Sequence, residues 1–219
     1  MLLSITAKSQ SWQPGRFYDI KGTKNTGFIR IDPRGKGPIK GEGFIEYKED
    51  EKAETIKLSA SDLRSFVAGR DSFVVAVAPT QGWAKYDLDF VRVAVDGPLR
   101  LFEAKGSAGD GSGVGLSPGI GVGMAGGGGT GGFGGGLGGG ISIPIGGGSR
   151  GRSGKAVYYY GANTASMKPL TNENFIDVMT EIMGDEPDVV EKIQTKKFSL
   201  RDINKLLTYF YQVQAAHGQ

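Results

Sequence analysis

The sequence predicts an α+β protein in which a small antiparallel β-sheet, or a partly open barrel, precedes a C-terminal subdomain of three helices. Residues 17–103 contain short runs of aromatic and β-branched residues separated by turn residues, as antiparallel sheets do. Residues 175–210 repeat apolar side chains at helical spacing. Between these parts, residues 106–154 hold 25 of the 38 glycines in this chain of 219 residues, which predicts one low-complexity insertion.

Six strand candidates follow one another in the front half: residues 27–31, 44–48, 55–58, 73–78, 86–95 and 99–102. The second and third alternate in polarity, so the acidic segment between them is expected to be the tip of a hairpin. Residues 59–66 predict either one helical turn or a short edge strand. The continuous apolar run 73–78 predicts a central strand covered on both faces. A change of phase within 86–95 predicts a β-bulge, or a strand that passes from one environment into another.

Three helices are expected after an aromatic strand at 157–160. The first has an apolar face and ends at Gly184. The second begins at Asp185-Glu186-Pro187, where acids meet the positive end of the helix dipole and proline occupies the first turn. Ser199 and Asp202 resemble a capping box that opens the third. The apolar face of the first helix consists of Phe175, Val178, Met179, Ile182 and Met183.

The chain therefore divides into four predicted segments. Residues 1–10 are a remnant of a signal peptide, residues 11–105 together with 155–161 form the β domain, and residues 162–219 form the helical subdomain. Residues 106–154 are predicted to be a disordered, exposed loop between two strands. A loop of this length can be tolerated there, because the entropy cost of closing a loop grows only slowly with its length. Residues 111–149 carry no charge, so self-association, surface adhesion and membrane insertion are the alternatives for this segment.

Composition excludes several kinds of site. The chain has no cysteine and a single histidine, His217, which excludes thiolate metal sites and disfavours a Ser-His-Asp triad. Residues 121–126 match G-x-G-x-x-G, but more glycine follows where a dinucleotide site needs a helix. Residues 148–155 fail as a P-loop because the spacing is one residue too long. No catalytic residue, cofactor or metal site is predicted, and no segment has the roughly 20 apolar residues of a transmembrane helix.

Charged and aromatic residues offer three weaker candidates. Residues 16–40 carry seven cations and two acids, and the following segment to residue 54 carries six acids and two lysines. We expect cross-strand charge pairs on a solvated sheet face, with an anion-binding strip near Phe17, Tyr18 and Phe28 as the alternative. The carboxylates available for hydrolysis are Asp87, Asp89, Asp96 and Glu103. A carbohydrate platform would use Trp12, Trp83 and residues 158–160.

Two strands and the helical tail carry a family resemblance. The strands are Val95-Asp96-Gly97-Pro98-Leu99-Arg100-Leu101-Phe102 and Tyr158-Tyr159-Tyr160, and the tail positions are Phe175, Met179, Asp185, Pro187, Val190, Lys192-Ile193, Phe198, Asp202-Ile203 and Tyr209. This pattern resembles uncharacterised exported proteins of Bacteroidetes bacteria. The resemblance implies a location in the cell envelope and transfers no catalytic residue. The glycine-rich interval departs from the family pattern.

The expected function is a structural or binding role in an exported bacterial envelope protein without catalytic activity. The apolar residues Leu2, Leu3 and Ile5 ahead of Ala7-Lys8-Ser9 support export, whereas a true start at Met1 without a signal peptide would make the protein cytoplasmic. Another envelope protein or a glycan is the expected partner, nucleic acid is disfavoured, and the oligomeric state is left open. The alternatives are a carboxylate-dependent hydrolase of envelope carbohydrate, and a binder of anionic surfaces or nucleic acid through residues 16–40. The binding candidates are Arg30, Arg34, Lys36, Lys40, Trp83, Tyr158 and Tyr160.

Overall fold

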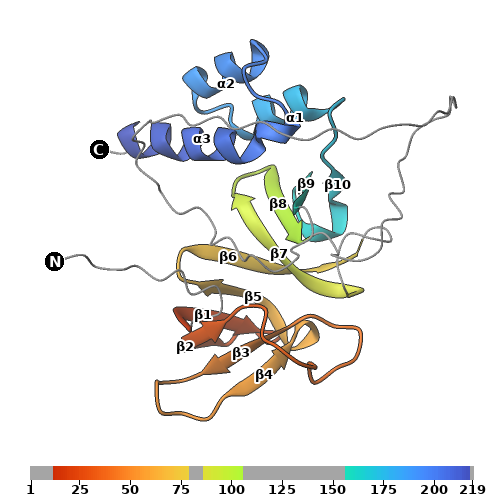
Figure 1. The fold of residues 1–219 in the computed structure, drawn as a ribbon, viewed down its shortest axis with the longest axis vertical. Helices are drawn as coiled ribbons and strands as arrows, with labels where there is room; N and C mark the ends of the chain where they lie inside the picture. The colour runs from red at the N-terminus through yellow and green to blue at the C-terminus, as the bar shows by residue number, and fades with distance from the viewer. Residues whose placement is uncertain (1–11, 79–85, 106–155, 218–219) are drawn as a thin grey trace, which may run out of the picture. The chain divides into compact units, whose positions relative to one another are not determined.

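Ten antiparallel strands and three α-helices make up the part of the chain that the computed structural model describes, namely residues 12–78, 86–105 and 156–217 (Figure 1). The strands form one sheet in the order β10-β9-β8-β7-β6-β5-β1-β2-β3-β4. The α+β class predicted from the sequence is therefore confirmed. The strands are β1 (Gln13–Asp19), β2 (Lys24–Arg30), β3 (Phe44–Lys48), β4 (Ile56–Ser59), β5 (Leu63–Ala68), β6 (Asp71–Val77), β7 (Leu88–Val95), β8 (Arg100–Lys105), β9 (Ala156–Gly161) and β10 (Lys168–Pro169).

The sheet curls back on itself between β3 and β7. Glu42 forms an isolated parallel bridge with Leu88, and the Gly43 N–H donates to the Leu88 carbonyl oxygen at 2.8 Å. A Cβ atom at Gly43 would clash with the Asp89 carboxylate, so a larger residue would require that side chain to move. The curl encloses one apolar cluster, which agrees with the prediction of a partly open barrel. Its buried members are Phe17, Ile29, Ile45, Tyr47, Leu63, Phe66, Ala68 and Phe73.

Strand β6 has apolar cover on both faces over most of its length, as its continuous apolar sequence predicts. Phe73 and Val75 pack into the enclosed cluster, whereas Val74 and Ala76 belong to a second cluster on the opposite face. The last residue, Val77, is 68% exposed, so the cover ends before the strand does. The second cluster also contains Val91, Phe102, Ala104, Tyr159 and Met167.

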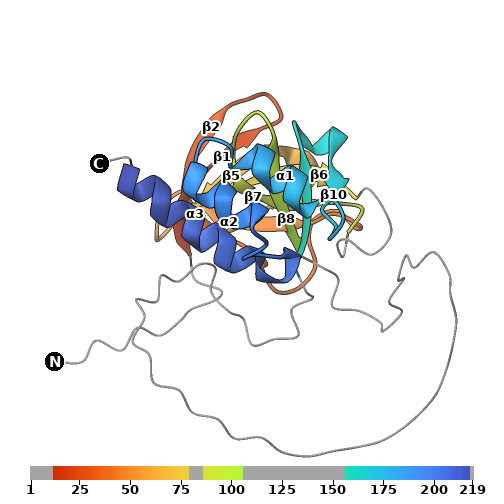
Figure 2. The same ribbon diagram turned by 90° about the horizontal axis from the view of Figure 1, so that it is seen from above.

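The three helices pack against β7, β8 and β9 at one end of the described unit (Figures 1 and 2). They are α1 (Phe175–Ile182), α2 (Pro187–Gln194) and α3 (Ile203–His217). Pro187 lies in the first turn of α2 as predicted. Before α3, the Ser199 side chain caps no backbone N–H as a capping box requires; its hydroxyl donates to the Asp202 carboxylate at 2.8 Å, and residues Leu200–Asp202 form a 3-10 turn. Their shared core contains Ala94, Val95, Leu101, Tyr158, Met179, Met183, Ile193, Leu206, Leu207 and Phe210.

Strand β7 contains a β-bulge and also passes from one apolar environment into another, the two features that its sequence predicts as alternatives. The register with β8 shifts between Val93 and Val95. Phe90 packs against the enclosed cluster, Val91 belongs to the cluster on the opposite face, and Val95 lies under the helices. The predicted bulge is confirmed, and its place is a few residues after the phase change at Phe90.

The mixed signals of residues 59–66 have two origins. Residues Ala60–Asp62 form a single 3-10 turn, which is the predicted helical turn. Strand β5 follows at once, and it lies between β1 and β6 in the interior of the sheet. The alternative of a short edge strand is therefore wrong, because Phe66 and its neighbours find pairing partners far away in the sequence.

The predicted insertion connects two strands that pair with each other. Strands β8 and β9 are antiparallel, and Lys105 lies opposite Ala156 at the ends of residues 106–155. The predicted disorder of this segment, and the signal-peptide remnant at 1–10, lie outside the described residues. Among the helices that the structure describes, none is long and apolar enough to cross a membrane.

Replacing residues 106–155 by a four-residue turn tests whether the segment belongs to the folding unit. We expect the shortened chain to fold and to gain about 2 kcal/mol in free energy of unfolding, because closing a loop of about 50 residues costs more entropy than closing one of four. Urea denaturation followed by circular dichroism measures this difference. A loss of cooperative unfolding, or a fall in stability, would show that the segment packs against the sheet.

Candidate functional site

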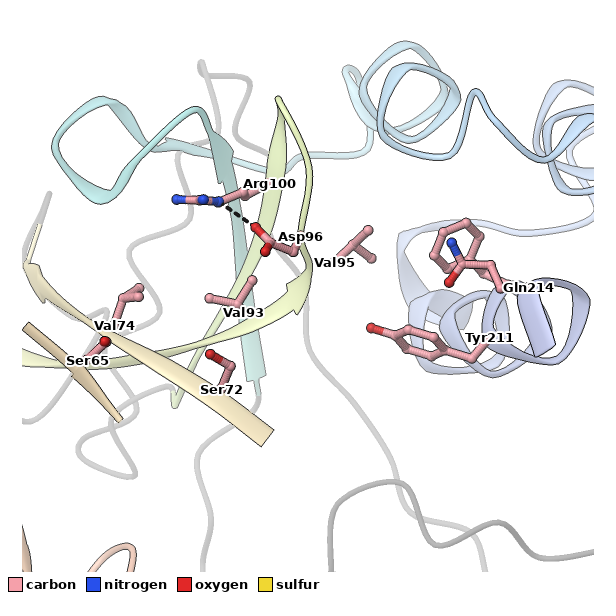
Figure 3. A pocket seen from close by; sticks show the side chains of 10 residues that line it. Ser65, Ser72, Val74, Val93, Val95, Asp96, Arg100, Tyr211 and Gln214 are labelled. Atoms are coloured by element: carbon pink, nitrogen blue, oxygen red, sulfur yellow. Dashed lines mark hydrogen bonds and ion pairs between the residues drawn. The ribbon is translucent and has the colours of Figure 1, made fainter. Parts of the chain in front are cut away.

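A pocket of about 430 Å³ opens where the sheet meets the C-terminal half of α3 (Figure 3). Both the strands and the helix contribute side chains to its walls. The sheet supplies Ser65, Ser72, Val74, Val93, Val95 and Arg100, the turn between β7 and β8 supplies Asp96, and α3 supplies Phe210, Tyr211 and Gln214.

Strand alternation explains the wall formed by the sheet. Ser72 and Val74 point away from the face of β6 that buries Phe73, and Ser65 lies directly opposite Val74 on β5. Ser65 and Ser72 line the pocket from this face, together with Val74 and Val93 of the second cluster. The β6 residues Ser72 and Val74 are partly exposed.

The helix contributes the opposite wall through its last turns. Figure 3 shows the Tyr211 side chain extending from α3 toward the strands. The Tyr211 hydroxyl donates to the Ala94 carbonyl oxygen, which attaches α3 to β7. Burial raises the pKa of Tyr211 above its usual value, so the hydroxyl stays a donor at neutral pH. Gln214 follows on the same side of the helix.

The polar groups of the pocket fall into two kinds. Arg100 Nε lies 2.7 Å from Asp96 Oδ1, so these two charges neutralise each other at the rim. Within the described residues, the side chains of Ser65, Ser72 and Gln214 have no hydrogen-bond partner. The pocket thus combines apolar valines with three groups that can both donate and accept hydrogen bonds.

A second polar cluster lies on the helix-covered face of the sheet, where its Arg92 and Asp71 are close to Tyr211 of the pocket. Arg92 donates to Glu103 Oε2 at 2.9 Å and to Asp71 Oδ1 at 3.4 Å, which ties β6, β7 and β8 together. Burial by itself would lower the pKa of Arg92, but the two carboxylates raise it. Arg92 therefore stabilises the fold, since its guanidinium is occupied by these two carboxylates.

Tyr158 joins the Arg92 cluster to the helices. Its hydroxyl donates to Asn204 Oδ1 of α3 at 2.7 Å. Burial, with a smaller effect of the Glu103 charge, raises the pKa of Tyr158 well above its usual value of 10.0. Tyr158 is only 5% exposed, so little of its ring is accessible to a carbohydrate.

The other binding candidates do not converge on one place. Arg30 is ion-paired with Glu46 across β2 and β3, and its guanidinium lies 4.7 Å from the centre of the Trp12 ring. This pair is of the cross-strand kind expected from the charge pattern. Arg34, Lys36 and Lys40 are exposed in the connection between β2 and β3, Tyr160 is half-buried against the helix core, and Trp83 lies outside the described residues.

The carboxylates considered for hydrolysis are also scattered. Asp96 is held by Arg100 and Glu103 by Arg92, whereas Asp87 is exposed. Asp89 accepts a hydrogen bond from the Phe90 backbone N–H at 2.8 Å. Of these four, only Asp96 lines the pocket. Across the described residues, no group of three or more acidic or histidine side chains could hold a metal ion.

Sequence reasoning missed the pocket because Ser65, Ser72 and Gln214 belong to no motif. The only local signal is that two serines occupy strand positions, where β-branched residues are usual. Comparisons of the chain with protein-family models, with curated proteins and with solved structures found no match. The class of protein is therefore defined by the α+β fold and by the pocket alone.

The raised pKa of Tyr158 predicts a loss of stability in alkali. The folded state favours the neutral phenol, so this contribution is intact below the ordinary pKa of 10.0 and is lost as the pH rises above 10. We expect Tyr158→Phe to lower the free energy of unfolding by about 1 kcal/mol at neutral pH, through loss of the bond to Asn204. We also expect it to flatten the decline above pH 10.

Urea denaturation at a series of pH values, with tyrosinate absorbance as a second signal, measures this effect. Tyr160→Phe on the same strand is the matched control and should keep the wild-type decline. An equally steep decline in Tyr158→Phe would assign the alkaline instability to other residues.

Proposed function

We propose that this chain is a non-catalytic binding protein of the bacterial cell envelope, and that the pocket beside α3 holds a small, hydroxyl-rich ligand. The observation that carries the proposal is the convergence of Ser65, Ser72 and Gln214, all without partners among the described residues, on a wall of valines. The envelope location rests on the family resemblance and on the apolar N-terminal residues.

The chemistry of the pocket suits a sugar. Serine hydroxyls and a glutamine amide each donate and accept, as the hydroxyl groups of a sugar do. Apolar side chains such as Val74 and Val93 offer surface for the carbon faces of the ligand, and this mixture is typical of small-molecule sites. The two serines do not improve a strand, so a binding role accounts for their presence.

The charges in the pocket support binding rather than hydrolysis. A glycosidase needs one carboxyl group as proton donor and a second carboxylate across the scissile bond. Asp96 is the one carboxylate that lines this pocket, and it is engaged in an ion pair with Arg100. The alternative of a carboxylate-dependent hydrolase draws no support from Asp87, which is exposed outside the pocket.

Gln214→Leu tests the pocket directly. We expect it to weaken binding of a neutral disaccharide about fivefold, because one hydrogen bond of about 1 kcal/mol is lost. Gln212→Leu on the same helix is the matched control, since Gln212 is exposed and does not line the pocket. Calorimetric titration of the full chain with maltose, cellobiose and diacetylchitobiose provides the measurement.

Two results would overturn the pocket as the binding site. One is the absence of binding to all three disaccharides, and the other is an equal loss in Gln214→Leu and Gln212→Leu. Release of monosaccharide during long incubation with the chain would instead restore the hydrolase alternative.

A further inference from the structure

We propose that the pocket is one end of a longer site for an acidic polysaccharide, which continues over the outer face of β5, β1, β2 and β3. The pocket end of this inference rests on the proposed function. The remainder is carried by five residues on the outer face of the curled sheet, here called the cationic strip: Arg16, Tyr18, Lys24, Phe28 and Lys48.

The strand register places the pocket and the strip on one face. Ser65 of the pocket lies opposite Tyr18, and Tyr18 lies opposite Lys24. In the next row, Val67 lies between Ser72 of the pocket and Arg16. Directly opposite residues in a sheet project from the same face, so both rows lead from the pocket into the strip.

The strip ends on β3. Phe28 of β2 lies opposite Lys48, whose Nζ is 5.8 Å from the centre of the Phe28 ring. Neighbouring strands are about 4.8 Å apart, so the path from β6 to β3 covers about 19 Å. This length calls for a polymer or an oligomer rather than a single small molecule.

The charges on this path lack compensation. Arg16 and Lys24 are exposed and form no ion pair with any residue in the described part of the chain. Glu46, which projects from the outer face of β3, is occupied by Arg30. Opposite charges on paired strands stabilise a solvated sheet, so cations without such partners indicate an anionic ligand.

The aromatic residues of residues 16–40 divide between the two faces of the sheet. Phe17 is 6% exposed and belongs to the enclosed core, so it is not available for stacking. Tyr18 and Phe28 lie on the outer face and are partly exposed beside the cations. Aromatic side chains next to cations suit an acidic polysaccharide, because the aromatic rings can stack on the sugar rings while the cations bind the carboxylates.

Two observations favour a polysaccharide over a nucleic acid. The pocket end offers uncharged hydroxyl and amide groups, which match sugar hydroxyls. At the other end, the exposed Glu49, Asp50 and Glu51 follow Lys48 directly. A nucleic acid carries a phosphate at every nucleotide and would be repelled there, whereas a glycan with a carboxylate on alternate sugars can place a neutral unit beside the acids.

Calorimetric titration of the full chain with three probes tests the inference. The probes are a hyaluronan hexasaccharide, in which glucuronate and N-acetylglucosamine alternate, the neutral N-acetylated chitohexaose, and an oligothymidylate of eight nucleotides. We expect the hyaluronan hexasaccharide to bind about tenfold more tightly than chitohexaose at low salt, because hydrogen bonds to charged groups exceed neutral ones. This advantage should shrink as salt is added.

The double variant Arg16→Gln/Lys24→Gln should remove the tenfold advantage and leave chitohexaose binding unchanged. Lys197→Gln is the matched control, because Lys197 is an exposed lysine between α2 and α3, away from the strip. A double variant that unfolds is detected by its circular dichroism spectrum. In that case the single Lys24→Gln variant, at an exposed position, is expected to lose at least half of the advantage.

The possible results separate the strip from the pocket. Equal binding of the acidic and neutral probes, with no effect of the double variant, overturns the strip while disaccharide binding in the pocket stands. Tighter binding of the oligothymidylate than of the hyaluronan hexasaccharide overturns the polysaccharide assignment. If the double variant weakens hyaluronan binding but Gln214→Leu does not, the proposed function of the pocket fails and the continuity of the two sites is overturned.

Discussion

Strand β7 contributes side chains to all three apolar clusters, and the rest of the structure depends on this arrangement. Its first residue, Leu88, bridges to the segment before β3 and holds the sheet in its curl, whereas Val95 at its other end lies beneath the helices. A regular strand presents each side chain to one of two faces only. The bulge between Val93 and Val95 interrupts this alternation of faces. One part of β7 can therefore be buried by the curled sheet and the next part by the helices.

The same arrangement determines which polar groups remain for binding. Toward the helices, the polar groups of β7 to β9 are fully engaged, since Arg92 holds Glu103 and Asp71 while Tyr158 bonds to Asn204. Buried polar groups with these partners stabilise the fold and are not available to a ligand. The pocket draws on both sides of the sheet: Ser72 and Val74 project from the face of the second apolar cluster, whereas Tyr211 of α3 lies close to Arg92.

Local signals in the sequence located most elements but few of their partners. The alternation of residues 44–48, the continuous apolar run 73–78 and the proline of α2 each act within a few residues. The hairpin of β3 with β4, the central position of β6 and the start of α2 hold in the structure, but β3 is buried along most of its length and not half-buried as its alternation predicts. Strand β5 was ambiguous because its interior position depends on pairing with β1, far away in the chain. The pocket was missed for the same reason, since Ser72 and Gln214 come from segments more than a hundred residues apart.

The sequence alone determined the α+β class, the succession of a β-rich part and three helices, and the position of the glycine-rich segment between two strands, because hydrophobic period and turn residues act locally. It did not predict β1 or β10. Tertiary structure decided which side chains of those elements meet. It separated Phe17 from Tyr18, burying the first and leaving the second beside Arg16 on the outer face. It also buried Tyr158, since the face of a strand that becomes core is set by what packs on it, and packing joins residues that are distant in sequence.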